Sequence, residues 1–261
     1  MAPGLHVVEA GTGATLVLVH GAMDRLAGLA RADRHQGAFR VVRYDRRGYA
    51  GSAPLGPGDL ATHAADLVDL LGALRVGGRP GDLPVVVGHS LGGLVALAAA
   101  RLAPGLIGAV GAHEPPPPWH RDWPPGIEDW AGDDTDAADL VIGRAVGVER
   151  WARAPAPLRA ARRAEGGAMM TEVRSLFVAP PGSLPAPLGP VAAPVILAHG
   201  SAGRAHVRTG VADLAGRLGT GAPERLEGPG HRAPTTHAPT YARWTASVAR
   251  LSVPAAAGDG A

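Results

Sequence analysis

Short, continuous runs of Val, Leu and other apolar residues alternate with longer amphipathic segments along most of this chain. Such a run is typical of a β-strand buried on both faces, because a strand buried on one face alternates apolar with polar residues. Two-sided burial requires helices on both sides of a parallel sheet. We therefore predict an α/β fold with a mostly parallel central sheet. Strands are expected at Leu5–Glu9, Thr15–Val19, Arg40–Tyr44, Leu83–Val87, Leu106–Ala112, Val195–Ala198 and Arg225–Leu226.

Helical spacing of apolar residues recurs between the expected strands. Between residues 60 and 74, Ala64, Leu67, Val68 and Leu71 fall on one helical face. Pro104 and Gly105 close another apolar segment in the way that helices commonly end. Core helices are expected at Leu60–Leu74, Leu91–Leu102, Val207–Leu218 and Thr236–Leu251.

One segment interrupts this alternation. It begins at the proline run 115–118 and ends in a proline-rich stretch between 180 and 194. Consecutive prolines favour a stiff, extended backbone and cannot continue a helix. We expect a core domain formed by residues 1–114 and 191–253, a helical cap formed by residues 115–190, and a flexible tail at 254–261. Cap helices are expected at Thr135–Val146, Leu158–Glu165 and Met169–Phe177.

Composition and charge exclude several functional classes. The formal net charge is only +2 and no basic cluster stands out, which argues against nucleic-acid binding. The absence of cysteine excludes disulfides, thiolate metal sites and thiol catalysis. The most apolar stretch, Val85–Val110, is broken by glycines, Arg101 and Pro104, so we expect no membrane span. With no signal pattern at the start of the chain, the expected location is the cytoplasm.

The segment Gly88-His89-Ser90-Leu91-Gly92 fits the pattern G-x-S-x-G. It follows an expected buried strand and opens an expected helix, the setting of a nucleophile elbow. Side chains at the two glycine positions would clash with the backbone of so tight a turn. The turn would lift the Ser90 hydroxyl above the sheet edge, and the Leu91 N–H at the helix start would face developing negative charge.

Four segments in order resemble the α/β-hydrolase fold family. They are His20-Gly21, the stretch from Tyr44 to Tyr49, the turn at Ser90, and Gly228-Pro229-Gly230-His231. The resemblance implies Ser90 as the nucleophile and His231 as the general base. It also implies that the N–H groups of Leu91 and Ala22 form the oxyanion hole.

The acid that would orient His231 is not where the family most often has it. The stretch 199–208, after the strand that follows the cap, contains no carboxylate. Glu114 ends the preceding strand, and some hydrolases of this family place their acid there. It also preserves the chain order serine, acid, histidine. We therefore assign the acid to Glu114, and leave open a Ser–His dyad, Asp213 or an aspartate of the cap.

Other residues are candidates for the base and for the substrate pocket. His237 is the main competitor of His231, and we place His89, Met23 and Met170 in the pocket. Four of the tryptophans fall in the expected cap, and we expect some of them over the site. A pairing of Asp24 and Arg25 with Arg46 or Arg47 would hold the Ala22 N–H in position, and we leave open a plain solvated charge pair instead.

No metal or cofactor signature stands out. The acidic stretch 133–136 lacks the glycine and distal glutamate of a calcium loop, and Gly11-x-Gly13 does not continue into a dinucleotide-binding fingerprint.

We therefore predict a hydrolase without cofactor or metal that cleaves an ester, thioester or lactone of a small apolar molecule, with no nucleic-acid or membrane partner and with a homodimer left open. The alternatives are a cofactor-free lyase, cyclase or acyl transferase on the same site, or a small-molecule receptor that has lost turnover.

Overall fold

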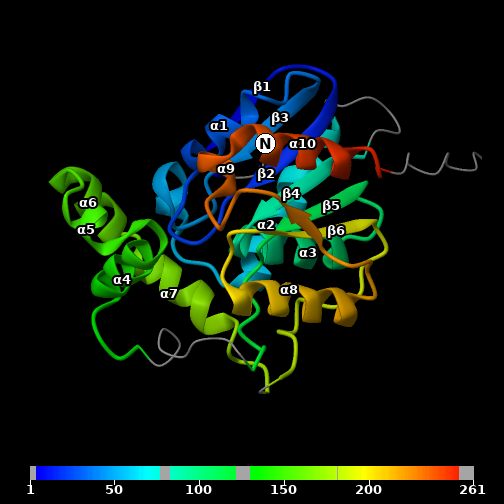
Figure 1. Cartoon of the computed structure of the whole chain (residues 1–261). Coiled ribbons are helices and arrows are strands. Elements are labelled where there is room, and N and C mark those ends of the chain that lie inside the picture. The colour runs from blue at the N-terminus through cyan, green and yellow to red at the C-terminus, as the bar shows by residue number, and fades with distance from the viewer. Residues whose placement is uncertain (1–3, 77–82, 122–129, 181, 253–261) are drawn as a thin grey trace, which may run out of the picture.

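The computed structural model describes residues 4–76, 83–121, 130–180 and 182–252. Its centre is a seven-stranded sheet with the strand order β1-β3-β2-β4-β5-β6-β7 (Figure 1). Strand β1 is antiparallel to β3, and every other neighbouring pair is parallel. The mostly parallel sheet predicted from the apolar runs is confirmed. The strands are β1 (Val7–Ala10), β2 (Ala14–Val19), β3 (Phe39–Tyr44), β4 (Val85–His89), β5 (Ala109–His113), β6 (Val195–Gly200) and β7 (Glu224–Leu226).

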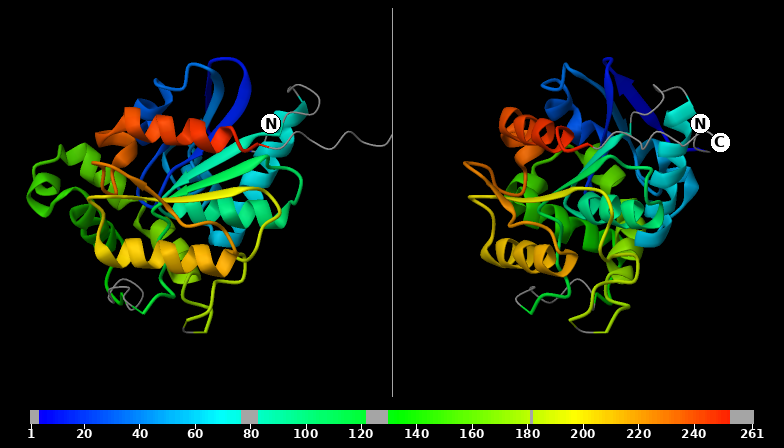
Figure 2. Two further views of the ribbon diagram at one scale, coloured as in Figure 1. Left: turned by 45° about the vertical axis from the view of Figure 1, so that its right-hand side comes forward. Right: turned by 90° about the vertical axis from the view of Figure 1, so that its right-hand side faces the viewer.

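Helices cover both faces of this sheet (Figure 2). One face carries α2 (Leu60–Val76), α3 (Leu91–Leu102) and α8 (Ala205–Leu218), and the other carries α1 (Ala30–Asp33) and α10 (Ala238–Ala249). Within the described ranges, no helix is long and apolar enough to cross a bilayer. The remaining core elements are the 3₁₀ helices η1 (Leu26–Leu29) and η2 (Ala50–Leu55) and the short helix α9 (Ala233–Thr236).

Strand β2 shows why its sequence is continuously apolar. Val17 and Val19 pack in the cluster on the α2 and α3 face, whereas Leu16 and Leu18 pack in the cluster on the α1 and α10 face. Successive side chains of a strand point to opposite faces, so burial of both faces requires an apolar residue at every position. All four of these side chains are fully buried.

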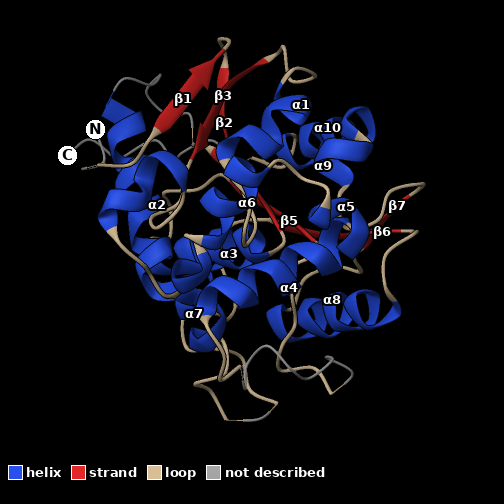
Figure 3. Cartoon of the chain, turned by 90° about the vertical axis from the view of Figure 1, so that its left-hand side faces the viewer, coloured by secondary structure: helices blue, strands red, loops and turns tan. Residues whose placement is uncertain are grey.

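Between β5 and β6 the chain leaves the sheet, and its described residues there form four helices, which we call the helical insertion. In Figure 3 these helices lie in front of the strands. They enclose a third apolar cluster, which includes Trp151 and Met169. The division into a cap of residues 115–190 and a core domain stays a prediction. The insertion comprises α4 (Asp134–Val146), α5 (Val148–Ala152), α6 (Ala156–Arg163) and α7 (Gly166–Ser175).

Two expected helices differ from the structure, one helix was not expected, and the expected tail lies outside the described part. The expected helix Thr236–Leu251 is two helices, because His237 leaves the helical conformation (φ −134°, ψ 46°) and the next helix begins at Ala238, with Pro239 in its first turn. The expected helix Met169–Phe177 starts at Gly166, which lies against the backbone of Asp134. Helix α5 was not predicted, because five residues are too few for a periodic signal. The expected tail at 254–261 lies outside the described residues.

Candidate active site

Ser90 lies in a strained turn between β4 and α3. Its backbone angles (φ 53°, ψ −130°) lie in a region that residues with a side chain rarely adopt. A Cβ added at Gly88 would collide with the Gly92 carbonyl, and one at Gly92 with the backbone of β2. The Ser90 N–H donates to the His113 carbonyl at 2.9 Å, which ties the turn to β5. Ser90 is therefore held at the start of α3, as the G-x-S-x-G pattern predicts.

Two backbone N–H groups next to Ser90 are free to bind an oxygen. Leu91 is the first residue of α3, so its N–H has no acceptor within the helix. The loop after β2 passes close to Ser90, since a Cβ on Gly21 would lie 2.8 Å from the Ser90 Cβ. In the described part of the chain, neither the Leu91 nor the Ala22 N–H has a hydrogen-bond acceptor. These are the two groups that the sequence assigned to an oxyanion hole.

Glu114 and His231 are in direct contact. His231 Nδ1 lies 2.8 Å from Glu114 Oε2, and Glu114 Oε1 accepts the Gly200 N–H at 2.9 Å. Burial would raise the pKa of the Glu114 carboxyl, but the hydrogen bond from His231 and nearby imidazoles hold that pKa below its ordinary value. A carboxylate at this position keeps the proton of His231 on Nδ1, which leaves a lone pair on Nε2.

Backbone strain gathers at this site. Four non-glycine residues in the described ranges have positive φ, and three of them line the cavities described below: Met23 (53°), Ser90 (53°) and Glu114 (46°). Glu114 keeps this conformation because its N–H donates to the Ala198 carbonyl at 2.8 Å, while its side chain is held by Gly200 and His231. Such strain persists only where the surroundings enforce it, and it is common at functional sites.

The rings of His89 and His113 continue from His231 into the protein. The ring of His89 lies 4.8 Å from that of His231 and 5.4 Å from that of His113. Burial lowers the pKa of His89 well below its ordinary value and lowers the pKa of His113 to about 4. Both rings are therefore neutral near pH 7.

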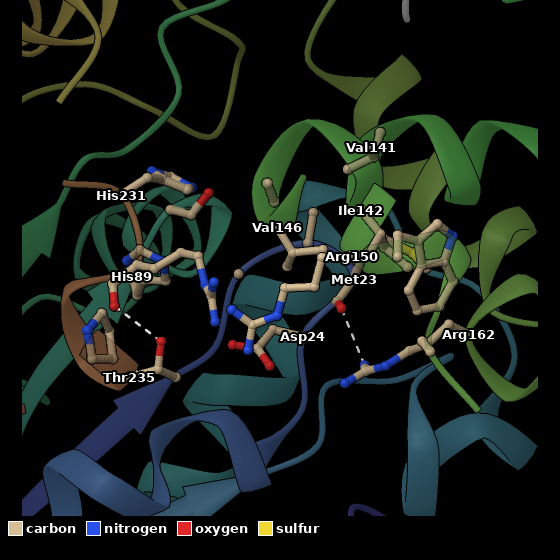
Figure 4. Close-up of a pocket in the computed structure, with 18 of the residues that line it drawn as sticks. Met23, Asp24, His89, Val141, Ile142, Val146, Arg150, Arg162, His231 and Thr235 are labelled. Carbon is tan, nitrogen blue, oxygen red and sulfur yellow. Dashed lines mark hydrogen bonds between the residues drawn. The ribbon is translucent and has the colours of Figure 1, made fainter. Parts of the chain in front are cut away.

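Two cavities meet at Ser90 and His231. The first, about 490 Å³, lies between the loop after β2 and helices α4 to α6, and Figure 4 shows Val141, Ile142 and Val146 on its wall. We call it the α5–α6 cavity. The second, about 480 Å³, lies between α7 and α8, and we call it the α7–α8 cavity. Both cavities are mostly apolar and both are covered by the helical insertion. A molecule bound on either side of Ser90 would therefore be shielded from bulk water.

A buried ionic network connects the insertion to the loop after β2. Arg46 donates to Glu172 of α7 at 2.5 Å, and also to the carbonyls of His20 at 3.1 Å and Gly21 at 3.0 Å. The Tyr49 hydroxyl donates to the same carboxylate at 2.5 Å. Burial opposes ionisation of Glu172, but Arg46 and His63 hold the pKa of its carboxyl below the ordinary value. Through Arg46, a carboxylate of the insertion thus fixes the turn that carries the Ala22 N–H.

This network was not predicted from the sequence. The pairing of Asp24 and Arg25 with Arg46 or Arg47, which was considered instead, is wrong. Arg25 pairs with Glu165, Arg46 with Glu172 and Arg47 with Asp66, and Asp24 pairs with neither Arg46 nor Arg47. One sequence signal was present: Glu172 interrupts the apolar stripe of α7, where a carboxylate must be paired if it is buried.

Some of the residues predicted to form the substrate pocket line the two cavities, and others do not. His89 and Met23 line the α5–α6 cavity, and so does Trp151, whereas Trp123 lies outside the described residues. Met170 is fully buried in the cluster of the insertion and lines neither cavity. Its neighbour Met169 lines the α7–α8 cavity instead.

The alternatives to Glu114 and His231 are engaged elsewhere. Asp213 pairs with Arg217 at 2.6 Å and accepts the Trp119 indole N–H at 3.1 Å. The described aspartates of the insertion bond to partners other than His231: Asp133 to Thr135, Asp134 to Arg174, Asp136 to Arg163 and Asp139 to Trp151. His237 contacts the Thr236 hydroxyl. Across the described ranges, no group of three or more His, Asp or Glu side chains could hold a metal ion.

The fold and the strained serine turn define an enzyme of the α/β-hydrolase type. The model of the alpha/beta hydrolase family matches residues 16–249, and the chain belongs to that family.

Solved structures of similar fold cover nearly the whole chain. The enol-lactonase from Burkholderia xenovorans LB400 has a TM-score of 0.67 at 20% identity and covers 94% of this chain and 96% of its own. The epoxide hydrolase VrEH1 from Vigna radiata has a TM-score of 0.66 at 16% identity, with 94% of both chains covered. An alpha/beta hydrolase from Sphaerobacter thermophilus DSM 20745 has a TM-score of 0.61 at 24% identity, covering 92% of this chain and 95% of its own. These likenesses concern the fold.

Proposed function

We propose that the protein is a serine hydrolase that cleaves an ester, thioester or lactone bond of a small, largely apolar molecule. The observation that carries this proposal is the Glu114–His231 hydrogen bond of 2.8 Å beside the strained Ser90 turn. A serine hydroxyl with no base beside it is a poor nucleophile, whereas a serine hydroxyl beside an oriented imidazole is activated.

We infer the reaction from the chemistry of these groups. His231 Nε2 takes the proton of the Ser90 hydroxyl as its oxygen attacks the substrate carbonyl. The Leu91 and Ala22 N–H groups bind the oxyanion, and the Glu114 carboxylate stabilises the imidazolium. His231 then gives the proton to the leaving oxygen or sulfur. Water, activated by the same histidine, releases the acid and frees Ser90.

The substrate class rests on the cavity walls. Val141, Ile142 and Val146 line the α5–α6 cavity, and Met169 and Val173 line the α7–α8 cavity. These walls suit an apolar acyl or leaving group, because burying apolar surface contributes about 25 cal/mol per Å². The alternative of a receptor without turnover rested on the lack of an acid in the stretch 199–208, and the contact between Glu114 and His231 removes that basis.

The test measures hydrolysis of p-nitrophenyl butyrate by the wild type and the Ser90→Ala variant. We expect kcat/KM to fall roughly a thousandfold or more in the variant. Ser247→Ala is the matched control, because Ser247 lies on α10, away from both cavities, and donates to the Trp244 carbonyl. Equal turnover by the wild type and Ser90→Ala would overturn the proposal.

A further inference from the structure

Three arginines converge at the mouth of the candidate active site. Arg31 comes from α1, Arg150 from α5 and Arg232 from the loop that carries His231. With Thr235 and Thr236 they line a hollow of about 460 Å³, which we call the arginine mouth. Two helices and a loop thus present positive side chains to one space.

Among the described residues, no carboxylate pairs with the guanidinium group of Arg150 or Arg232. In the described part of the chain neither forms an ion pair, although arginines nearby, such as Arg25 and Arg162, pair with Glu165. No carboxylate lines the arginine mouth among the described residues. Unpaired positive charges that face each other repel, so an arrangement of this kind favours an anion between them.

The arginine mouth is continuous with the space next to Ser90. Arg150, Arg232 and Thr235 also line the α5–α6 cavity, together with Ser90 and His231. Figure 4 shows the Arg150 side chain extending into this cavity. Arg232 directly follows His231 in the chain. An anion held there would belong to the molecule that reaches the serine.

Local contacts hold Arg232 in place. The hydroxyls of Thr235 and Thr236 both donate to the Arg232 carbonyl, at 3.0 and 2.9 Å.

Asp24 is the one carboxylate among the described residues that line the α5–α6 cavity. Burial raises the pKa of Asp24, and one of its oxygens already accepts the Arg25 N–H at 2.9 Å. Arg150, Arg162 and Arg232 line the same cavity, so arginines outnumber this carboxylate and the lining is net positive even with Asp24 ionised.

We infer that the substrate carries an anionic oxygen group, a carboxylate or a phosphate, which Arg150 and Arg232 bind at the arginine mouth while the scissile carbonyl lies at Ser90. Arginine suits both groups, because its planar fork donates two parallel N–H bonds. This inference rests on the proposed function and adds the charge of the substrate to it. Arg31 extends the positive surface outward and attracts the anion toward the mouth.

The experiment compares three p-nitrophenyl esters of similar length. One is the mono-ester of adipic acid, which ends in a carboxylate, the second is its neutral methyl-capped diester, and the third ends in a phosphonate. We expect the wild type to prefer at least one anionic ester over the neutral ester by tenfold or more in kcat/KM, and to lose this preference as salt is added. The arm with the larger preference identifies the anion.

Variants connect the preference to the two arginines. Arg232→Gln should lower the ratio of anionic to neutral kcat/KM about tenfold, and Arg150→Gln, which is exposed, about threefold. Arg153→Gln is the matched control. Arg153 directly follows α5, is exposed, pairs with Glu149 and lines none of these cavities. Its ratio should equal that of the wild type. No preference for either anion in the wild type, or ratios unmoved in both variants, would overturn the inference.

A binding measurement separates this failure from failure of the proposed function. Calorimetry of Ser90→Ala with monomethyl adipate and with dimethyl adipate needs no turnover. Tighter binding of the monoanion, lost when Arg150→Gln and Arg232→Gln are added, supports the anion site even in a protein without hydrolysis. Equal affinities overturn the inference, while hydrolysis of the neutral ester that depends on Ser90 leaves the proposed function standing.

Discussion

Replacing Glu172 with Gln tests how firmly the insertion is tied to the loop that carries Ala22. The Glu172 carboxylate receives hydrogen bonds from Arg46 and Tyr49, and His63 Nε2 lies 3.1 Å from it. Arg46, Tyr49, His63 and Glu172 are each at most 1% exposed. The glutamine keeps the shape but removes the charge and turns one acceptor into a donor that faces other donors.

The expected loss of stability follows from the burial of Arg46. Removing one partner of a buried ion pair leaves the other charge without compensation, which destabilises a protein by about 3–5 kcal/mol. We therefore expect Glu172→Gln to lower the free energy of unfolding in urea by about 3 kcal/mol or more. We also expect a lower kcat on p-nitrophenyl butyrate, because Arg46 holds the carbonyls of His20 and Gly21.

The matched control is Asp134→Asn. Asp134 also belongs to the insertion and pairs with an arginine, Arg174, at 3.0 Å, but both side chains are partly exposed. An exposed pair contributes less than about 1 kcal/mol, so this variant should unfold close to the wild type. If Glu172→Gln and Asp134→Asn shifted the unfolding free energy equally, the argument from the buried network would be refuted.

Two further predictions concern the histidines. Glu114→Gln should lower kcat roughly a thousandfold or more with little change in KM, because an amide donor at this position can reverse the tautomer of His231, and an unchanged kcat would remove Glu114 from the mechanism. Burial lowers the pKa of His113 from 6.5 to about 4, so the unfolded chain takes up this proton first as the pH falls. The stability that neutral His113 contributes is present above pH 6.5 and is lost as the pH falls toward 4. By pH 5 this cause should have lowered the free energy of unfolding in urea by about 2 kcal/mol. His113→Phe should show a flatter dependence on pH, and an equal slope in both proteins would contradict this cause.

The sheet was predictable because its signal is local. Continuous apolar runs mark β2 and β4 whichever way the chain folds, since burial of both faces favours an apolar residue at each buried position. The ends of elements were less predictable. Helix α7 starts at Gly166 because that glycine can approach the Asp134 backbone, and this is a contact between segments far apart in the sequence.

The candidate site was predictable where it depends on short motifs. Ser90 and His231 stand in segments whose glycines report tight turns, and the structure places Glu114 against His231. Contacts across the insertion were not predictable, because nothing local pairs Arg46 with Glu172, 126 positions away. The same holds for the arginine mouth, where α1, α5 and the His231 loop meet only in the folded chain. The cytoplasmic location and the homodimer stay predictions.

Covalent labelling with a fluorophosphonate, followed by mass spectrometry of the modified peptide, tests the central claim most directly. It requires no knowledge of the substrate, because the reagent reacts with a serine that is activated by a base. We predict a single modified peptide that contains Ser90, no label in Ser90→Ala, and much slower labelling in Glu114→Gln. A wild type that takes up no label, or takes it up at another serine, would contradict the account of Ser90 as a nucleophile activated by His231.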